Sequence, residues 1–306
     1  MRVFVTGASG HIGSAVVPDL LAAGHTVLGL ARSDASAAAL ATAGVEVQRG
    51  SLDDLDGLRA GAVDADGVIH LAFKHELTYA GEFVRAAESD LRVVEAIGAA
   101  LDGSDKPFVI TSGTALLGMA APGQLGLETA ALERGPRVDS ENTVVAMAAR
   151  GVRSSVIRLP PTVHSSLDHH GFVPTLIAMA RKHGVSVYVG EGANRWPAVH
   201  TLDAARLYRL AVESAPAGAR LHGVAEQGVP FRQIAEAIGR GLGLPAVSVT
   251  PDDAGTYLGF LATFAQVDNP SSSAATRALL HWEPTHAGLL ADLEERHYFE
   301  LPQTSR

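Results

Sequence analysis

The sequence predicts an α/β fold in which a doubly wound parallel sheet is followed by a smaller lobe. In the first half of the chain, short runs rich in β-branched residues alternate with alanine-rich stretches of helical length. This alternation is typical of right-handed βαβ crossovers, which build a parallel sheet. The strand-like runs are apolar throughout, as expected where helices cover both faces of the sheet.

The spacing of elements changes after Leu159-Pro160-Pro161, where prolines become frequent. We therefore expect a first domain over residues 1–160, joined by a returning strand near 185–200, and a smaller substrate-binding lobe over residues 161–306. The predicted strands cover residues 3–6, 26–30, 45–48, 67–71, 108–111 and 154–159, and the predicted helices cover residues 11–23, 35–43, 53–60, 78–101, 139–150, 172–183, 202–213 and 231–242.

The composition indicates a globular protein and excludes several classes of function. Apolar residues make up 47% of the 306 residues and charged residues 19%. The formal net charge of 24 − 33 = −9 argues against general binding to nucleic acid, which needs a dense basic face. The absence of cysteine excludes disulfides, thiolate nucleophiles and cysteine-ligated metals. No apolar stretch reaches the ~18 residues of a membrane span, and a strand-like run begins at Val3, so we expect a cytoplasmic protein without a signal peptide or membrane contact.

A glycine-rich turn follows the first predicted strand and opens the first predicted helix. It reads Thr6-Gly7-Ala8-Ser9-Gly10-His11-Ile12-Gly13. Gly7 permits the tight turn, Gly10 lets backbone amides approach a phosphate, and Gly13 lets the helix pack close to the sheet. The helix N-terminus then offers free N–H groups and a partial positive charge. We therefore expect a dinucleotide to bind here, contacted by Thr6, Gly7, Ser9, Gly10, His11, Ile12 and Gly13.

The end of the second predicted strand indicates which dinucleotide binds. Arg32 and Ser33 stand where a carboxylate would otherwise accept the ribose 2′-hydroxyl of NAD. Because a guanidinium pairs well with a phosphate, we expect Arg32 and Ser33 to contact the 2′-phosphate, and NADP(H) to be favoured over NAD(H). The alternative is a solvated Arg32 that Asp34 neutralises.

These motifs resemble those of the short-chain dehydrogenase/reductase superfamily, in its extended or atypical branch of epimerase- and dehydratase-like proteins. The resemblance rests on the spacing Gly7-x-x-Gly10-x-x-Gly13 after Thr6 and on His70-Leu71-Ala72 at the end of the fourth strand. It covers essentially the whole chain and implies a Rossmann-type fold. It also implies cofactor contacts from Ser51 and Leu52 at the adenine, Leu71, Ala72 and Phe73 at the ribose, Thr111 beside the nicotinamide, and Leu159, Pro160 and Val163 over its ring.

The catalytic residues are the part of the pattern that this sequence does not match. Members of the superfamily usually carry a tyrosine, a lysine four residues later and a serine after the fifth strand. None of the five tyrosines here has a lysine at that distance. The resemblance places the tyrosine position on Glu133, which could donate a proton only if burial raised its pKa, and the lysine position on Arg137. The serine position falls on Gly113, between Ser112 and Thr114, whose hydroxyls would either hold a substrate oxygen or only satisfy backbone groups.

Side chains beyond the fourth and sixth strands are candidates for contacting the substrate. They are Lys74, His75, His164 and His170, together with Trp196 in a segment that mixes aromatic and cationic residues. Trp196 could instead fill the core between the lobes. His169 and His170 beside Asp168 suggest a metal site, but adjacent side chains seldom point the same way, and we expect no metal.

These features favour an NADP-dependent oxidoreductase that acts on a carbonyl, alcohol or related C=X group of a small molecule. Two alternatives stay open: an epimerase or dehydratase of the nucleotide-sugar type, and a non-catalytic NADP-binding sensor or scaffold. A homodimer is a further expectation, since members of the superfamily often pair through the helix over 78–101. In that helix a stripe of small and apolar residues recurs at steps of three and four, through Val84, Ala87, Leu91, Val94, Gly98 and Leu101.

Overall fold

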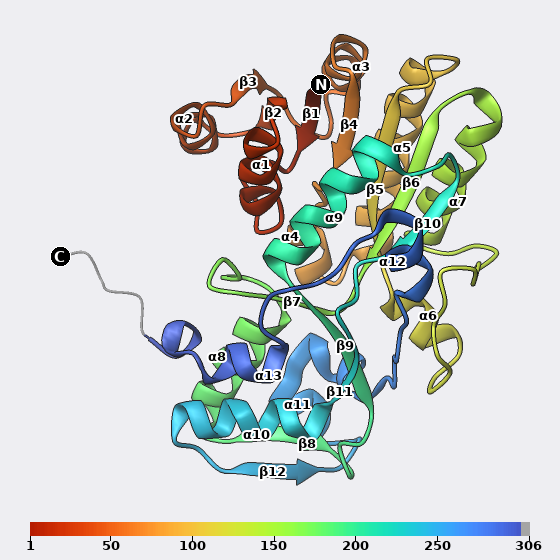
Figure 1. Cartoon of the computed structure of the whole chain (residues 1–306). Coiled ribbons are helices and arrows are strands. Elements are labelled where there is room, and N and C mark those ends of the chain that lie inside the picture. The colour runs from red at the N-terminus through yellow and green to blue at the C-terminus, as the bar shows by residue number, and fades with distance from the viewer. Residues whose placement is uncertain (301–306) are drawn as a thin grey trace.

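One large parallel sheet organises the chain, which confirms the predicted α/β, Rossmann-type fold. The computed structural model describes residues 1–300. Seven parallel strands follow the order β10-β6-β5-β4-β1-β2-β3, and helices cover both faces of this sheet (Figure 1). The strands are β1 Arg2–Thr6, β2 Thr26–Ala31, β3 Glu46–Arg49, β4 Gly67–His70, β5 Pro107–Gly113, β6 Arg153–Leu159 and β10 Ala219–His222.

The helices beside this sheet form two layers. On one face α1 packs against α9, and on the other α3 packs against α5 and α5 against α7. The predicted helix over 78–101 is wrong at its start, because Gly81 adopts φ +82° and separates α4 from α5. The helices are α1 Gly13–Ala22, α2 Asp34–Thr42, α3 Leu55–Asp64, α4 His75–Tyr79, α5 Phe83–Leu101, α6 Ala115–Ala120, α7 Val138–Ala146 and α9 Thr201–Ser214.

The strand that returns to the large sheet is β10, not a strand near 185–200. β10 pairs in parallel with β6, from Ala219 beside Ser155 to His222 beside Arg158. The segment expected to return instead forms β8 (Ser186–Val189) and β9 (Arg195–His200), which pair within the small lobe. The boundary at residue 160 stays a prediction, although α9 and β10 both come back to the large sheet after it.

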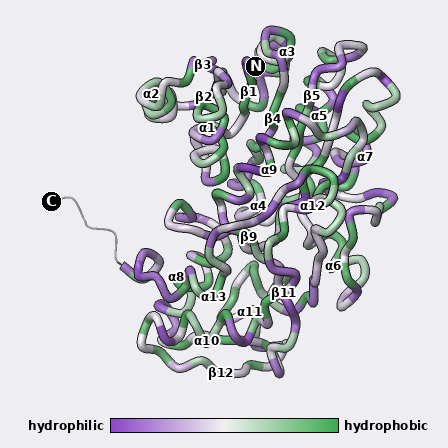
Figure 2. The backbone as a smooth tube through the Cα atoms, in the orientation of Figure 1, coloured by the Kyte–Doolittle hydropathy of each residue, from purple (hydrophilic) through white to green (hydrophobic). Residues whose placement is uncertain are grey.

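The small lobe is built on two further sheets. β7 (Thr162–His164) and β11 (Glu226–Pro230) flank β9, and β8 pairs with β12 (Ala246–Val249). Hydrophobic and hydrophilic residues alternate along α10 (Figure 2), whose apolar side chains point into the lobe's core. The helices of this half are α8 Phe172–His183, α10 Phe231–Leu242, α11 Ala254–Leu258, α12 Ala274–Leu280 and α13 Leu289–Glu294.

The small-residue stripe of α5 faces the protein interior. Ala87, Val94, Gly98 and Leu101 are buried, whereas Val84 at the helix start is 56% exposed. The outward face carries charged residues, at Arg85, Glu88, Arg92 and Glu95. The homodimer stays a prediction, and α5 offers it a charged face rather than an apolar one. No helix within residues 1–300 is long and apolar enough to cross a bilayer.

A buried carboxylate ties β10 to the rest of the sheet. Glu141 of α7 accepts hydrogen bonds from Arg158 of β6 (Nε to Oε2, 3.0 Å) and from Arg220 of β10 (Nε to Oε1, 2.7 Å). Burial alone would raise the pKa of Glu141, but these two guanidinium groups hold it below its usual range. Arg158 is itself only 1% exposed, so each of the two buried charges needs the other.

Replacing Glu141 with glutamine should lower the free energy of unfolding by about 3–5 kcal/mol, because Arg158 would stay buried without its counter-charge. Denaturant titration measures this difference. Glu88→Gln, on the exposed face of α5, is the matched control and should change it by less than about 0.5 kcal/mol. A similarly small change in Glu141→Gln would contradict the assignment.

Candidate functional site

The glycine-rich turn between β1 and α1 is shaped by close backbone contacts. Gly7 has φ +70°, and a Cβ there would lie 2.8 Å from the backbone nitrogen of Ala72. A Cβ on Gly13 would overlap the carbonyl oxygen of Gly7. Gly10, in contrast, is exposed, and its Cβ would meet only that same oxygen, at 3.3 Å. Gly7 and Gly13 are therefore required by the fold, whereas Gly10 leaves room on the outer side of the turn.

The N-terminus of α1 is open to an anion. Its N-cap residue is Ile12, whose side chain makes no capping hydrogen bond. The amides of Ser14 and Ala15 donate to the carbonyls of Gly10 and Ile12, whereas those of Ile12 and Gly13 make no hydrogen bond within the described residues and are free to bind a ligand. Ser9 beside it is exposed. Thr6 is instead fully buried, with Oγ1 2.6 Å from Nδ1 of His70, and it holds the turn to the end of β4. The turn therefore fits a dinucleotide pyrophosphate.

His11 links the turn to the second half of the chain. Its Nε2 lies 2.9 Å from Oγ1 of Thr201, and its Nδ1 lies 3.6 Å from Oδ1 of Asp168 in the β7–α8 loop. Burial lowers the pKa of His11 to about 4, helped by neighbouring histidines. Burial also raises the pKa of Asp168 to about 6, against the opposing effect of hydrogen bonds from Gly171 and Tyr298. At neutral pH this contact joins a carboxylate to an uncharged imidazole.

The strand ends at the adenine side carry two arginines. Arg32 has a 76% exposed side chain, with Nη1 3.4 Å from Oε1 of Glu76. Ser33 is the N-cap of α2 and accepts a hydrogen bond from the amide of Ser36. Sequence reasoning missed Arg49 at the end of β3, which donates to the carbonyl of Ser33 at 2.5 Å and to Oδ1 of Asp34 at 2.7 Å. No sequence motif marks Arg49, which lies one residue beyond the predicted strand 45–48; its pairing with Ala31 places it at this edge of the sheet.

Other predicted adenine contacts lie on the same edge. Ser51 and Leu52 are partly buried after β3, and Ser51 Oγ accepts a hydrogen bond from the amide of Asp53. Lys74, predicted to face the substrate, instead extends to this side, where its Nζ lies 2.6 Å from Oδ1 of Asp53. This ion pair turns Lys74 toward the segment after β3, and its contact with the substrate stays a prediction.

At the nicotinamide side, β4, β5 and β6 end next to one another. Leu71 donates its amide to the carbonyl of Thr6, and Ala72 lies against Gly7. The hydroxyl of Thr111 turns inward, to the carbonyl of His70 at 3.2 Å and the hydroxyl of Tyr208 at 2.7 Å. The segment after β6 is largely buried here, with Leu159, Pro160 and the partly buried Val163.

The two candidate hydroxyls at the end of β5 differ in their surroundings. Ser112 is 4% exposed, and its Oγ has no hydrogen-bond partner among the described residues. Thr114 is fully buried, and its Oγ1 accepts a hydrogen bond from Nδ2 of Asn269 at 3.1 Å. A buried hydroxyl is rarely left without a partner, which distinguishes Ser112 from Thr114 as the candidate for a ligand contact.

Arg137 is held by three contacts at the end of β5, one of them to the residue before Ser112. Its Nη1 donates to Oδ1 of Asp90 at 3.1 Å, its Nη2 donates to the carbonyl of Thr111, and its guanidinium lies 4.3 Å from the ring centre of Phe73. Burial alone would raise the pKa of Asp90, but Arg137 and then His70 hold it below its usual range. Sequence reasoning missed Asp90; the signal was an acidic residue on the otherwise apolar face of α5.

The remaining three candidates differ in how far their side chains are buried. Glu133 is exposed, so it lacks the burial that a proton donor at this position would need. His164 is fully buried, and its Nδ1 lies 2.8 Å from Oδ2 of Asp292. Trp196 is 1% exposed and packs on Phe231, so it is a core residue, but in the core of the small lobe rather than between the lobes.

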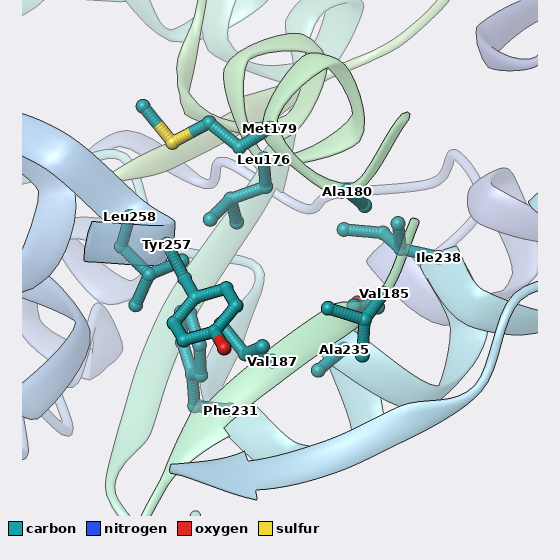
Figure 3. A pocket seen from close by; sticks show the side chains of 11 residues that line it. Leu176, Met179, Ala180, Val185, Val187, Phe231, Ala235, Ile238, Tyr257 and Leu258 are labelled. Carbon is teal, nitrogen blue, oxygen red and sulfur yellow. The ribbon is translucent and has the colours of Figure 1, made fainter. Parts of the chain in front are cut away.

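His75, in α4, and His170, in the β7–α8 loop, are both exposed. The ring of His75 contacts Phe73 at a centroid distance of 5.3 Å. The exposed His170 accepts a hydrogen bond from the hydroxyl of Tyr79 through its backbone carbonyl, at 3.3 Å. The apolar cavity in Figure 3 lies elsewhere, between α8, β8, α10 and α11, and its volume of about 10 Å³ has room for a single water. It is a packing defect of the core.

Comparison with known proteins places the chain in a family. The model of the NAD dependent epimerase/dehydratase family matches residues 3–222. The chain belongs to this family. Its members include enzymes of the NAD-dependent oxidoreductase and epimerase type, and the recognised resemblance is thereby confirmed.

Relatives and solved structures agree with this assignment. The chain is 48% identical to an uncharacterized protein of Schizosaccharomyces pombe, over 98% of this chain and 100% of the relative. It is 28% identical to 2′-dehydrokanamycin reductase of Streptomyces kanamyceticus, over 80% of this chain and 68% of the relative. Its fold matches that of dTDP-glucose 4,6-dehydratase from Streptomyces venezuelae with NAD bound, at a TM-score of 0.74 and 19% identity, over 96% of each chain.

The titration of Asp168 gives a test of this family member's β7–α8 loop. Its folded pKa of about 6 exceeds the ~3.9 of an unfolded aspartate, so its stabilising contribution is complete below about pH 4 and is lost as the pH rises through about 6. Asp168→Asn removes this loss. The variant's free energy of unfolding, relative to wild type, should rise by about 2–3 kcal/mol between pH ~4 and ~7.5.

Denaturant titrations across that pH range measure this difference. Asp252→Asn, an exposed position, should run parallel to wild type throughout. A difference between Asp168→Asn and wild type that does not change with pH would show that Asp168 has an ordinary pKa.

Proposed function

We propose that this family member is an NADP-dependent oxidoreductase that reduces a carbonyl or related C=X group of a small molecule, or oxidises the corresponding alcohol. The main support for the proposal is the buried hydroxyl of Ser112, which has no hydrogen-bond partner at the end of β5. Arg137 is fixed at the carbonyl of the preceding residue, Thr111. The reductase among the relatives supports reduction as the reaction. The missing tyrosine–lysine pair argues against epimerase or dehydratase chemistry, which depends on a strong base.

The preference for NADP(H) rests on charges at the ends of β2 and β3. Arg32 is exposed, and its contact with Glu76 is long, at 3.4 Å, so its guanidinium is available to a 2′-phosphate. Asp34, the nearest carboxylate in sequence, is directed to Arg49 instead. No acidic side chain stands at the tip of β2 itself, where NAD-binding members of such folds use one for the ribose hydroxyl.

The chemistry that follows from the side chains is electrostatic. The bound nicotinamide supplies or accepts the hydride. Ser112 donates a hydrogen bond to the substrate oxygen, and Arg137 provides a fixed positive charge close to the negative charge that develops there. An arginine at this place cannot release a proton, because a guanidinium stays protonated in proteins. The proton that completes the alcohol therefore comes from water rather than from a phenol.

Cofactor binding is the first test. Calorimetry should show NADPH binding more tightly than NADH, and Arg32→Ala should reduce this preference by about tenfold, since it removes one charged contact. Arg92→Ala, exposed on α5, is the control. Gly10→Ala should fold normally, because its Cβ meets only one atom at 3.3 Å, but should bind both nucleotides weakly. Equal affinities of wild type for NADPH and NADH would refute the cofactor preference.

The role of Ser112 gives a second test, measured as NADPH oxidation with a panel of aldehydes and ketones. Ser112→Ala should lower kcat by about 100-fold, the usual effect of losing one donor to a developing oxyanion, with NADPH affinity retained. Ser214→Ala, at the exposed end of α9, should match wild type. Turnover that survives in Ser112→Ala would move the donor elsewhere, and absence of turnover by wild type on every substrate would favour the sensor alternative.

A further inference from the structure

A continuous line of aromatic rings leads from the nicotinamide side of the site into the small lobe. Phe73, directly after β4, contacts His75 at a centroid distance of 5.3 Å, and His75 stacks with Tyr79 at 6.2 Å. Tyr79 meets Phe260 edge-on at 5.6 Å, and Phe260 meets Phe172 at 6.3 Å. The line therefore runs from the end of β4 through α4 to the segment after α11 and the start of α8.

The two ends of this line are fixed, but its middle is uncovered. At one end Arg137 lies over Phe73, at 4.3 Å. At the other, Phe172 packs against Trp196 in the core of the small lobe. Between them Tyr79 is 55% exposed and Phe260 is 41% exposed. Two large rings in mutual contact, with this much surface in water, form an exposed apolar patch.

The position of the patch indicates what covers it. It is continuous, ring by ring, with Phe73, whose neighbour Arg137 binds the carbonyl of Thr111 next to Ser112. The hydroxyl of Tyr79 donates to the backbone carbonyl of His170, so its ring bridges α4 and the β7–α8 loop. A molecule seated on these rings would extend toward Ser112, where we place the reacting carbonyl.

Charge argues against a nucleotide sugar on this patch. In the ring-bearing segments 73–83 and 257–264, Lys74 is the one lysine or arginine, and it is bound by Asp53 at 2.6 Å. Burial, and then the nearby Arg137, lower the pKa of His75, so that it is uncharged at neutral pH. A diphosphate would find no unpaired cation here, whereas an uncharged ring would find two aromatic faces.

We propose that Tyr79 and Phe260 determine specificity by holding an uncharged aromatic or fused-ring compound whose carbonyl points to Ser112. This inference rests on the proposed function and names its substrate class. Stacking on two aromatic side chains orients the flat part of the substrate. The two ends of the line, Phe73 and Phe172, hold the rings of Tyr79 and Phe260 in place.

Two readouts test this inference, one of them independent of turnover. The first is calorimetric binding of 2-naphthamide, an uncharged analogue that carries a carbonyl, to protein saturated with NADP⁺. The second compares the reduction of 2-naphthaldehyde with that of butanal. Phe260→Ala and Tyr79→Ala are the test variants, and Leu279→Ala, a 48% exposed position on α12, is the matched control.

Wild type should bind 2-naphthamide, and each test variant should bind it about tenfold more weakly, as expected for the loss of one ring contact. The KM for 2-naphthaldehyde should rise by about the same factor, with kcat and the kcat/KM for butanal little changed. Phe260→Tyr should restore binding, because it keeps the ring. NADPH affinity should be unchanged in all variants.

Several results would overturn the inference. They are equal 2-naphthamide affinity in wild type and both test variants, tighter binding of UDP-glucose than of 2-naphthamide, or a dimer in wild type that sedimentation shows is lost in Phe260→Ala. If NADPH binds and butanal is reduced normally, these results reject the aromatic subsite alone. If wild type binds no NADPH, the proposed function itself fails.

Discussion

The close contact between the first turn and the end of β4 determines the geometry of the whole site. Gly7 approaches Ala72 so closely that no side chain fits between them, and the buried Thr6 is tied to His70. This contact directs the free amides of α1 outward and places Leu71, Ala72 and Phe73 beside them. Parallel strands end at the same edge of their sheet, so the ends of β5 and β6 complete the site there.

The second constraint is the buried ion pair between Asp90 of α5 and Arg137, which stands at the position that the resemblance gives to the superfamily's lysine. Arg137 cannot give up a proton, and Asp90 opposite it stays ionised because Arg137 and His70 outweigh the effect of its burial. Such a pair is costly to desolvate, but it fixes the direction of the guanidinium. In the function that we propose, the site therefore offers a stationary charge and one hydroxyl, Ser112, rather than a proton relay. In such a site, catalysis would depend more on how well the substrate fits than on the acidity of any protein group.

The two halves of the chain share this site rather than meeting at a simple boundary. The second half supplies α9 and β10 to the large sheet, where Arg220 binds Glu141. It also supplies Thr201 and Asp168, which contact His11 in the first turn. The small lobe reaches the site again through Phe260 and Phe172, against Tyr79 of α4. The two halves are therefore in contact both at the first turn and at the line of aromatic rings.

The sequence by itself determined the βαβ order, the first turn and its three glycines, and the absence of the tyrosine–lysine pair. These follow from local spacing and from backbone conformation, which neighbouring residues dictate. Only the tertiary structure decided that Glu133 is exposed, that Lys74 turns to Asp53, that Trp196 belongs to the core, and that β10 is the returning strand. It also brought in Asp90, Arg49 and Phe260, none of which lies in a recognisable motif. Burial, ion pairing and strand order depend on contacts between residues that are distant along the chain. Local sequence patterns do not predict which distant residues come into contact.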